Sequence, residues 1–511
     1  MTVRVTTAEQ AAARDAAAIS AGVASWTLMQ HAGSATAQLI LQRYPDVRIS
    51  GAIVYAGSGN NGGDAYVVAR VLAEARCPVT VIAQAAPSSE DARRAQVEAL
   101  AVVHEVSDPP RPAVIVDGLL GVGARGEARA EIAEQIRAIA EWRAQGAAVV
   151  ALDLPSGMDA DTGAGGVVVR ADLTCTYGTV KRGLLLRRDE AGEILCLDIG
   201  LGAHAAIPDQ APILLDADWV REAIPPLPAD AHKGVRRRLA IIGGGEGMAG
   251  APMLAARGAM RSGIGMVRLL VSPNNVPVVQ AALPETMAAR WPVTAEDQQR
   301  VLGWTHTLLI GPGLGRTTMT RALVERLLVE WKGPVVLDAD ALNVFEGEPR
   351  TLGSLLGARP AIVTPHPVEA GRLLRRTGAV VSAARFSVGL ELAKQLGATV
   401  LLKGVPTVIS TPDGRVAVSA AGSPTLGTAG SGDVLGGIVA TLLAQTGDPF
   451  AAAASAAWVH GRAGELAAMR GSVRGSSLED VVVALREVWR LDDPTPARPV
   501  LCALPSTGRS R

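Results

Sequence analysis

The sequence predicts two successive α/β domains, each built on a mainly parallel β-sheet with helices on both faces. Short β-branched runs alternate with alanine-rich helical stretches through most of the 511 residues. This alternation is typical of βαβ units. The chain also exceeds the length at which one hydrophobic core keeps growing, so two or more domains are expected.

The first domain is expected to span residues 1–210. The segment 64–76, DAYVVARVLAEAR, has the pattern of a helix that follows a strand and leads to the next one. Loops at the carboxyl ends of parallel strands meet along one edge of the sheet. Four apolar runs are candidate strands, at residues 50–57, 78–84, 113–119 and 147–155.

The alternation breaks near residue 211, where a proline-rich stretch, 211–231, suits a linker. A second α/β series follows, and we expect a second domain over residues 232–490. The end of the chain, 491–511, is aperiodic and rich in proline, and is predicted to be a flexible tail. The candidate strands of the second domain lie at residues 237–244, 266–272, 306–313, 334–340, 360–367 and 398–404.

Composition excludes several classes of protein. With 49 basic and 49 acidic residues the net charge is zero, which argues against nucleic-acid or anionic-membrane partners held by bulk charge. No apolar run reaches the roughly 18 residues of a membrane span. The first residues lack the apolar stretch of a signal peptide, so we expect a cytoplasmic protein. The four cysteines show no metal-ligand spacing and fit a reducing compartment.

Three glycine-rich segments have the GxGxxG spacing, beginning at Gly57, Gly121 and Gly245. A dinucleotide fingerprint also needs an acidic residue about 20 positions later, at the end of the next strand. The strand after Gly57 ends in Gln84, and the one after Gly245 ends in Ser272. An ordinary NAD-dependent dehydrogenase is therefore not expected.

The segment 57–70, GSGNNGGDAYVVAR, follows a strand and opens a helix, where glycines and free N–H groups favour phosphate. Two further segments, 117–127 and 153–163, also end strands of this half. Oxygen-bearing side chains on these three segments could converge on one crevice, and hard donors of this kind suit an alkali or alkaline-earth ion rather than zinc. The alternative is an ordinary strand-to-helix turn. The side chains concerned are Asn60, Asn61, Asp64, Asp117, Asp153 and Ser156.

The second half predicts phosphoryl chemistry. The segment 425–443 places Gly430, Gly432 and Asp433 directly before an apolar helix. Closely spaced N–H groups there form an anion hole, and the acid could accept a hydroxyl proton; the alternative is a simple helix cap. Only five of the 49 basic residues are lysines, and one of them, Lys403, ends a strand where it could hold a nucleotide phosphate.

These segments, in this order, resemble the NAD(P)H-hydrate repair family, in which a YjeF N-terminal-type epimerase is fused to a carbohydrate-kinase-type, ribokinase-like dehydratase. The resemblance covers about residues 5 to 490. It implies a Rossmann-like three-layer αβα domain followed by a ribokinase-like αβα domain. The motifs that carry it are residues 60–64, 117–127, 153–163, 232–234, 241–252, 310–315, 337–343, 364–369, 402–404 and 429–437.

The resemblance implies two reactions. The epimerase interconverts the R and S forms of NADHX and NADPHX, in which water has added at C6 of the nicotinamide ring. The dehydratase converts the S form back to NADH or NADPH, with ADP in bacterial members and ATP in eukaryotic ones. K⁺ would bind in the epimerase domain, and Mg²⁺ would accompany the nucleotide. Similar proteins often form homo-oligomers, which we expect here, with small-molecule substrates and no nucleic-acid or membrane partner.

The resemblance also assigns residues of the first domain. Asp153 is expected to contact the hydrate and to transfer the proton. Potassium ligands are expected at Asn61, Asp117 and Ser156. The other hydrate-binding residues are expected to be Asn60, Asn61, Gly62, Gly63, Asp64, Gly121, Val122, Gly123, Ala124, Arg125, Gly126 and Glu127.

In the second domain, Asp433 is expected to be the catalytic base. The hydrate pocket is expected to contain Ala251, Gly313, His366 and Asp433. The nucleotide is expected to contact Lys403, Gly404, Val405, Pro406, Thr407 and Gly432.

Two alternatives remain open at this level. The second domain could be a small-molecule kinase of the ribokinase fold, acting on a vitamin precursor or a sugar alcohol. The first domain could be a non-catalytic binding module, because such a scaffold supports many functions. The kinase alternative gives the first domain no role, and the polar set around Asp153 argues against a passive module.

Overall fold

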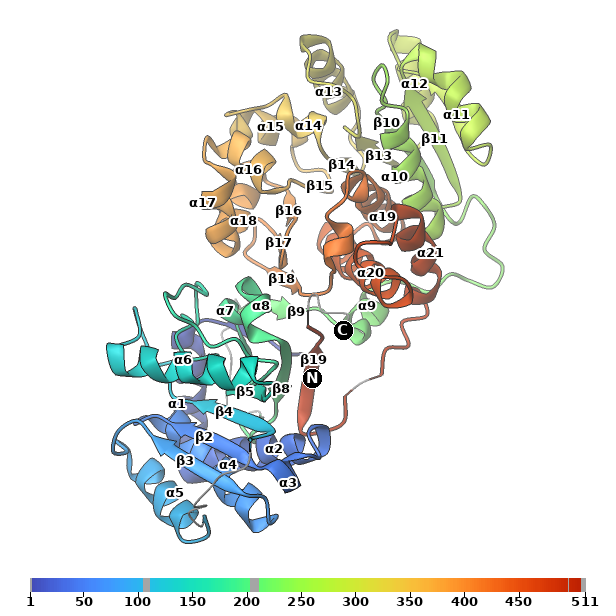
Figure 1. Ribbon diagram of the computed structural model, residues 1–511. Helices are drawn as coiled ribbons and strands as arrows, with labels where there is room; N and C mark the ends of the chain where they lie inside the picture. Colours follow the sequence, from blue (N-terminus) through green and yellow to red (C-terminus); the bar gives the residue numbers. More distant parts are fainter. Residues whose placement is uncertain (1, 104–110, 203–210, 495, 507–511) are drawn as a thin grey trace. The chain divides into compact units, whose positions relative to one another are not determined.

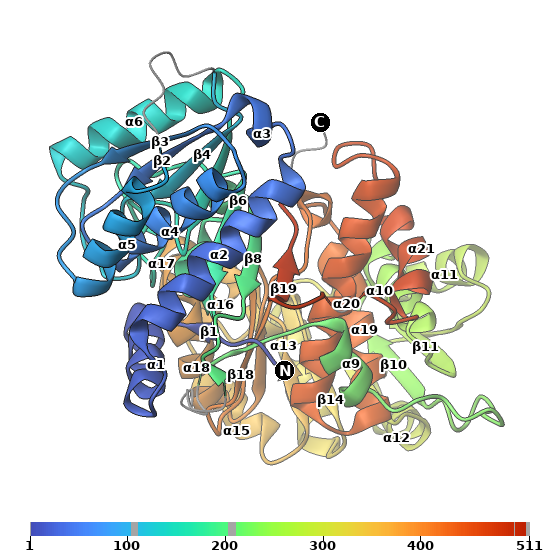
Figure 2. The same cartoon turned by 90° about the horizontal axis from the view of Figure 1, so that it is seen from below.

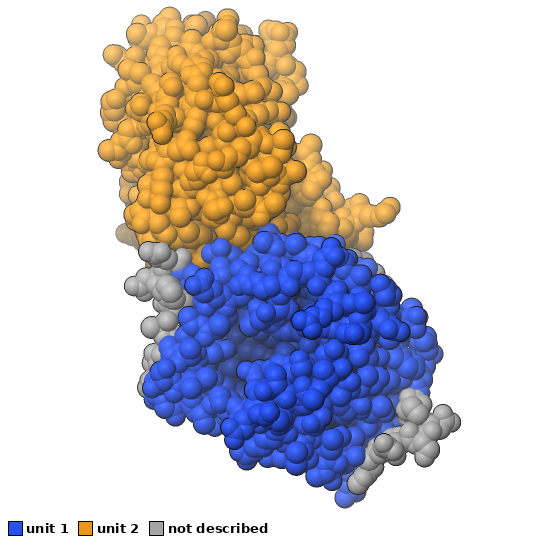
Figure 3. All heavy atoms as spheres, turned by 90° about the vertical axis from the view of Figure 1, so that its left-hand side faces the viewer, with its two compact units in different colours: residues 1–211, 494–509 blue, residues 212–493, 510–511 orange. Residues whose placement is uncertain are grey.

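The computed structural model describes residues 2–103, 111–202, 211–494 and 496–506. They form two compact units, coloured separately in Figure 3. Unit 1 contains the described residues up to Ala211 and those from Pro494 onward, and unit 2 contains Pro212–Asp493. The first change of unit lies where the sequence pattern breaks.

In the described residues, unit 1 has a seven-stranded sheet in the order β19-β8-β6-β5-β4-β2-β3. The four strands expected from the sequence are confirmed. Every pair is parallel except β19–β8. The expected strands are β2 (Ala52–Ala56), β3 (Val79–Ala83), β4 (Val114–Gly118) and β5 (Ala148–Leu152), and the further ones are β6 (Leu173–Tyr177), β8 (Glu193–Leu197) and β19 (Val500–Leu504).

Helices cover both faces of this sheet (Figure 1), because successive strand residues point to opposite sides. Val54 and Val116 pack with helices α2, α4 and α5, whereas Ile53 and Ile115 pack with α6. The three-layer αβα arrangement is thereby confirmed for unit 1. Its helices are α1 (Ala8–Ser20), α2 (Ser25–Arg43), α3 (Val47–Ser50), α4 (Asn60–Glu74), α5 (Glu90–Leu100), α6 (Ala130–Ala144), α7 (Arg182–Leu186) and α8 (Arg188–Ala191).

A second, two-stranded sheet joins the start of the chain to the middle of unit 1. Strand β1 (Val5–Thr6) pairs in parallel with β7 (Val180–Lys181). Thr6 and Thr179 are buried, and their hydroxyl oxygens lie 2.8 Å apart in a hydrogen bond. The N-terminal segment is therefore anchored beside Lys181.

The expectation of a flexible tail over 491–511 is wrong for residues 500–504. These residues form β19, which pairs antiparallel with β8. Strand β8 is apolar and would otherwise leave its hydrogen-bonding groups unpaired at the sheet edge. The rest of the tail lies partly outside the described residues.

The expectation of a free linker over 211–231 is likewise wrong in part. Strand β9 (Ile213–Leu214) pairs with β18 of unit 2. Helix α9 (Ala217–Ala223) follows, and its Trp219 meets Phe450 edge-on, with ring centroids 6.1 Å apart. These apolar side chains bury surface against each other, which holds the segment in place within unit 2.

Unit 2 has a ten-stranded sheet in the described residues, in the order β12-β11-β10-β13-β14-β15-β16-β17-β18-β9. The six strands expected from the sequence are confirmed, and the pairs β16–β17 and β17–β18 are antiparallel. The expected strands are β10 (Arg238–Ile242), β11 (Met266–Val271), β13 (Thr307–Ile310), β14 (Val335–Leu337), β15 (Ala361–Val363) and β16 (Thr399–Leu402), and the others are β12 (Met287–Arg290), β17 (Thr407–Ser410) and β18 (Val416–Ser419).

The sheet of unit 2 also separates two helical layers (Figure 1; Figure 2). Leu239 and Ile241 pack with α10, α19, α20 and α21, whereas Ala240 and Ile242 pack with α13, α15, α16 and α18. The helices are α10 (Gly250–Arg261), α11 (Val276–Ala282), α12 (Ala295–Trp304), α13 (Thr318–Glu330), α14 (Asp340–Asn343), α15 (Pro349–Leu356), α16 (Pro367–Leu374), α17 (Gly378–Ala383), α18 (Arg385–Leu396), α19 (Ser431–Thr446), α20 (Pro449–Arg470) and α21 (Leu478–Val488).

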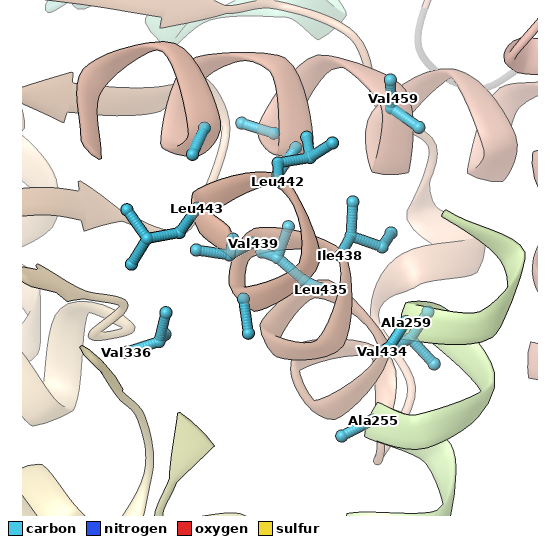
Figure 4. Packing of buried hydrophobic residues seen from close by; sticks show 14 of the residues in the cluster. Ala255, Ala259, Val336, Val434, Leu435, Ile438, Val439, Leu442, Leu443 and Val459 are labelled. Atoms are coloured by element: carbon cyan, nitrogen blue, oxygen red, sulfur yellow. The ribbon is translucent and has the colours of Figure 1, made fainter. Parts of the chain in front are cut away.

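Helix α19 is buried on nearly every side, as its almost continuous apolar sequence requires. Figure 4 shows Leu435, Val439 and Leu443 of this helix, together with Ala255 of α10 and Val336 of β14 from the elements around it. Glycines let α10 and α19 touch: a Cβ added to Gly437 would lie 1.8 Å from Ala255 O. No helix in the described ranges is both long and apolar enough to span a membrane.

Candidate active sites

A cavity of about 710 Å³ opens in unit 1 at the carboxyl ends of β2 and β4. The chain passes from β2 to β3 on one side and then to β4 on the other, which creates the crevice where open α/β sheets bind ligands. The loops after both strands and one face of α1 line it. Of the residues expected to bind the hydrate, the cavity lining contains Asn60, Asn61, Asp64, Gly121, Val122, Gly123, Ala124 and Asp153.

The remaining expected residues are not in the cavity lining. A Cβ on Gly62 would lie 1.9 Å from Gly57 O, and one on Gly63 would lie 2.5 Å from Met29 Cε. These two glycines therefore allow α4 to pack closely against its neighbours. The others, Arg125, Gly126 and Glu127, lie further along the loop after β4.

Asp153 is the most heavily bonded acid at this cavity. It follows β5 with φ +61°, a left-handed conformation that aspartate tolerates better than most residues. Its Oδ1 accepts hydrogen bonds from Lys181 Nζ, from Thr176 Oγ1 at 3.2 Å and from Tyr177 N at 3.3 Å. The carboxylate is therefore fixed, and it is 8% exposed.

Three further carboxyl groups line the same cavity, and two of them, Asp15 from α1 and Asp64 from α4, interact electrostatically with Asp153; the third is Asp91. Burial raises the pKa of Asp15 and of Asp64, and the negative charge of Asp153 raises each further. The ammonium of Lys181 acts in the opposite direction on both groups. This cluster combines the Lys181–Asp153 ion pair with two acids whose pKa values are raised, an arrangement suited to proton transfer.

The three residues expected to hold a cation lie together beside the cavity. Asp117 accepts hydrogen bonds from Ser156 N at 2.8 Å and from Ser156 Oγ at 2.5 Å. Asn61 Nδ2 donates to Leu120 O at 3.0 Å, and Leu120 N donates to Ser156 Oγ at 2.9 Å. Asn61 Oδ1 is buried without a partner. Burial raises the pKa of Asp117 to about 6.

In unit 2, Asp433 lies in the first turn of α19, where free N–H groups favour anions. Burial and the nearby charge of Asp338 raise its pKa to about 7. Lys403, at the end of β16, donates to Asp338 at 2.8 Å and lies 3.8 Å from Glu369. A Cβ on Gly432 would lie 3.3 Å from Lys403 Nζ, so the expected phosphate lysine and the expected base meet at one place.

The other expected residues of unit 2 form two smaller groups. His366 caps α16: its Nδ1 accepts from Val368 N at 3.1 Å, and its own N donates to Glu369 Oε2 at 2.9 Å. Gly313 has φ +59°, and an added Cβ would lie 3.0 Å from Ala251 Cβ. Ala251 and Gly313 are thus brought together as expected.

The nucleotide-binding stretch expected at 403–407 connects β16 to β17. Gly404 has φ +141°, and a Cβ there would lie 2.4 Å from Arg385 Nη1. The same guanidinium donates to Pro406 O at 2.6 Å, and Thr407 Oγ1 donates to Gly404 O at 3.0 Å. Val405 is exposed, at 62%. Arg385 therefore holds the backbone of this loop in place.

Sequence reasoning did not select Lys181, Asp15, Asp338 or Glu369. The scarcity of lysine is the one sequence signal that points to Lys181. Asp338 and Glu369 lie within motifs that carried the resemblance, but nothing in the sequence gave them a partner. Their roles depend on distances to Lys403, 65 and 34 positions away in the chain.

Comparisons with known proteins cover both units. Residues 25–183 match the family described as YjeF-related protein N-terminus, and residues 239–485 match NAD(P)H-hydrate dehydratase. The bifunctional NAD(P)H-hydrate repair enzyme Nnr of Escherichia coli is 34% identical over 91% of this chain and 90% of its own length. The enzyme of the same name from Coxiella burnetii is 35% identical over 92% and 96%.

The chain belongs to the family of bifunctional NAD(P)H-hydrate repair enzymes. These relatives match about nine-tenths of this chain, unit 1 included, and the alternative of a small-molecule kinase with a non-catalytic first domain is not favoured. Among solved structures, the ADP/ATP-dependent NAD(P)H-hydrate dehydratase of Bacillus subtilis, co-crystallised with ATP/Mg²⁺, is 29% identical. It covers 54% of this chain and 97% of its own, with a TM-score of 0.47.

Proposed function

We propose that this protein repairs hydrated NADH and NADPH in two steps. Unit 1 interconverts the R and S hydrates, and unit 2 dehydrates the S form with ADP, which gives NAD(P)H, AMP and phosphate. The proposal rests on one observation. In a single chain of this family, the unit 1 cavity contains an acid cluster, and unit 2 contains Asp433 and Lys403. We expect a cytoplasmic homo-oligomer.

In the epimerase, Asp153 is the proposed proton-transfer group. Its Oδ1 is held by three donors, and within the described residues its Oδ2 accepts no hydrogen bond. Oδ2 is thus free to take the proton of the C6 hydroxyl while the C6–N1 bond opens and leaves its electron pair on N1, and to return that proton when the ring closes on the other face of C6. The N–H groups of the loops after β2 and β4 would hold the phosphates of the coenzyme.

Potassium fits the group formed by Asn61, Asp117 and Ser156. All three offer hard oxygen donors, and the buried Oδ1 of Asn61 lacks a partner, as a cation ligand would. The described residues contain no cluster of three or more His, Cys, Asp or Glu suited to a metal. The proposed ion would instead be bound by amide and hydroxyl oxygens together with one carboxylate. The ion would stabilise the charge of Asp117 and fix the loop after β4.

In the dehydratase, Asp433 is the proposed base. It would accept the proton of the C6 hydroxyl while the β-phosphoryl group of ADP is transferred to that oxygen. The C6–O bond then breaks as phosphate leaves, and transfer of a proton from C5 to that phosphate restores the C5=C6 double bond of the ring. Lys403 and the N-terminus of α19 would stabilise the charge on the transferred group. Magnesium would enter on the nucleotide phosphates, with Asp338 and Glu369 supplying nearby carboxylate oxygens.

A spectrophotometric assay tests the dehydratase. The purified chain is mixed with S-NADPHX, Mg²⁺ and either ADP or ATP, and the absorbance of the reduced nicotinamide is followed. We expect an ADP-dependent rise that Asp433→Asn lowers by at least about 100-fold. Consumption of nucleotide with small alcohols, without any rise with the hydrate, would instead indicate a kinase.

The epimerase is tested without nucleotide, so that no dehydration occurs. R-NADPHX is incubated with the chain, and the R and S forms are separated chromatographically. Asp153→Asn should abolish the interconversion and leave dehydration of S-NADPHX intact. Persistence of epimerisation in this variant would show that Asp153 is not the proton-transfer group.

A further inference from the structure

Lys181 is a buried ammonium group in the unit 1 cavity, only 2% exposed. Its Nζ donates to Asp153 Oδ1, to Thr176 Oγ1 at 3.0 Å and to Tyr177 O at 3.2 Å. An ammonium group has three N–H donors, so the protein itself uses all of them. Lys181 therefore has no donor left for a substrate and can act only through its neighbours.

Asp153 is the ion-pair partner of Lys181, and its two carboxylate oxygens make unequal numbers of contacts. Oδ1 accepts bonds from Lys181, Thr176 and Tyr177, whereas Oδ2 accepts none within the described residues. Fixing one carboxylate oxygen by three donors sets the direction of the other. One oxygen of the Asp153 carboxylate is therefore held by the protein, and the other is available to contact the hydrate.

We propose that Lys181 is a positioning residue of the epimerase, which anchors Asp153 Oδ1 and keeps this carboxylate charged so that Oδ2 exchanges the proton. The inference rests on the proposed epimerase function. It adds a residue to which no role had been assigned, and it explains why a chain with few lysines places one in a buried position.

The start of the chain holds Lys181 in place. Thr6 of β1 lies opposite Lys181 of β7 in a parallel ladder. Val180 N donates to Arg4 O at 3.0 Å, and the Thr6 and Thr179 hydroxyls are hydrogen-bonded. Because the backbone on both sides of Lys181 is paired or bonded, its ammonium group has little freedom to leave Asp153. The first strand is thereby part of the epimerase site.

The charges around the pair favour this division of roles. Asp15 and Arg14 face it from α1, Asp64 from α4 and Tyr177 from β6. Burial, followed by neighbouring charges that include Asp153, raises the pKa of Asp64, and burial also raises that of Asp15. Both shifts disfavour negative charge on Asp64 and Asp15 relative to free side chains, and the ion pair with Lys181 is made by Asp153.

The test compares Lys181→Met, Lys181→Gln and Lys181→Arg in the full chain, with epimerisation of R-NADPHX followed in the absence of nucleotide. Lys181→Met should lower kcat by at least about 100-fold with little change in KM, because binding does not use Lys181. The acidic limb of the pH profile should move to higher pH, since removing a positive charge favours the protonated carboxyl. Lys181→Arg, which keeps the charge, should recover part of kcat.

Dehydration of S-NADPHX by each variant serves as an internal control, because unit 2 should be unaffected. Arg43→Met is the matched control within unit 1: it removes a cation that pairs with Glu193 and does not line the cavity. It should leave epimerisation unchanged. If Lys181→Met is insoluble, Lys181→Gln decides, because it also lacks the charge and should show the same pH shift.

The outcomes separate the inference from the function on which it rests. Wild-type kcat and an unshifted pH profile in Lys181→Met or Lys181→Gln, while Asp153→Asn is inactive, would overturn the role of Lys181. Full epimerisation by Asp153→Asn would instead overturn the proposed site. A loss of kcat without any pH shift and without recovery in Lys181→Arg would indicate a purely structural lysine and would also overturn the inference.

Discussion

At the scale of single residues, the environment of Asp433 differs strongly from that of a free side chain. Burial and the charge of Asp338 raise its pKa to about 7, while Lys403 opposes that rise. A general base works best when its pKa lies near the working pH. If Asp433 served only to cap the helix, it would not need to be buried beside other charged groups.

The pH dependence of dehydration should therefore reflect Asp433. Because its pKa is raised to about 7, the ionised base is the major form only above that pH, so kcat/KM should rise through about pH 7 and level off in alkaline solution. Asp338→Asn should move this limb to lower pH, since it removes a negative neighbour. Initial rates with S-NADPHX and ADP between about pH 5.5 and 9 measure it; a flat profile would argue against Asp433 as the base.

The cation site gives a second prediction at this scale. Replacing K⁺ by tetramethylammonium should lower epimerisation, because the oxygens of Asn61 and Asp117 would lose their ion. Asp117→Asn should raise the K⁺ concentration for half-maximal activity by about tenfold or more, because ligand charge sets cation affinity. A titration of the epimerase rate with KCl measures both effects. Equal rates with and without K⁺ would exclude a functional site here.

At the scale of elements, contact between α10 and α19 fixes the position of the dehydratase base. A Cβ on Gly437 would lie 1.8 Å from Ala255 O, and one on Gly258 would lie 2.3 Å from Val434 O. Neither of these two contacts can widen unless α10 or α19, both buried, moves. The apolar sequence of α19 predicts burial, but not this closeness.

Gly437→Ala should accordingly destabilise unit 2 by at least about 1–3 kcal/mol, the usual cost of overpacking. Gly303→Ala is the matched control: Gly303 also lies in a helix, α12, and a Cβ there meets nothing within 4 Å. Since alanine favours helix over glycine, the control should be neutral or slightly stabilising. Urea unfolding of both variants gives the comparison, and equal stabilities would show that α10 and α19 can separate freely.

At the scale of the whole molecule, unit 1 is discontinuous in sequence. The chain leaves it after Ala211 and returns at Pro494, so unit 2 is inserted between β8 and β19. The strand at the end of the chain covers the edge of β8 through an antiparallel ladder. Arg188 also donates to Pro505 O within this unit.

Deleting residues 496–511 should therefore destabilise unit 1 rather than unit 2. The edge of β8 would be exposed, and we expect a lower thermal midpoint for epimerase inactivation and a tendency to aggregate. Dehydration of S-NADPHX, measured on the same samples, should keep its wild-type thermal midpoint. Loss of both activities together would contradict an effect confined to unit 1.

The sequence by itself determined the ten strands that were expected and confirmed, because β-branched runs between glycine-rich loops carry their own local signal. It also determined the motifs at the strand ends, where Asn61, Asp117 and Ser156 meet as expected. Only the tertiary structure decided the partner of Asp153 and the pairing of β19 and of β9. Those features depend on atoms brought together from distant positions, and burial and Coulomb energies follow spatial distance rather than separation along the chain.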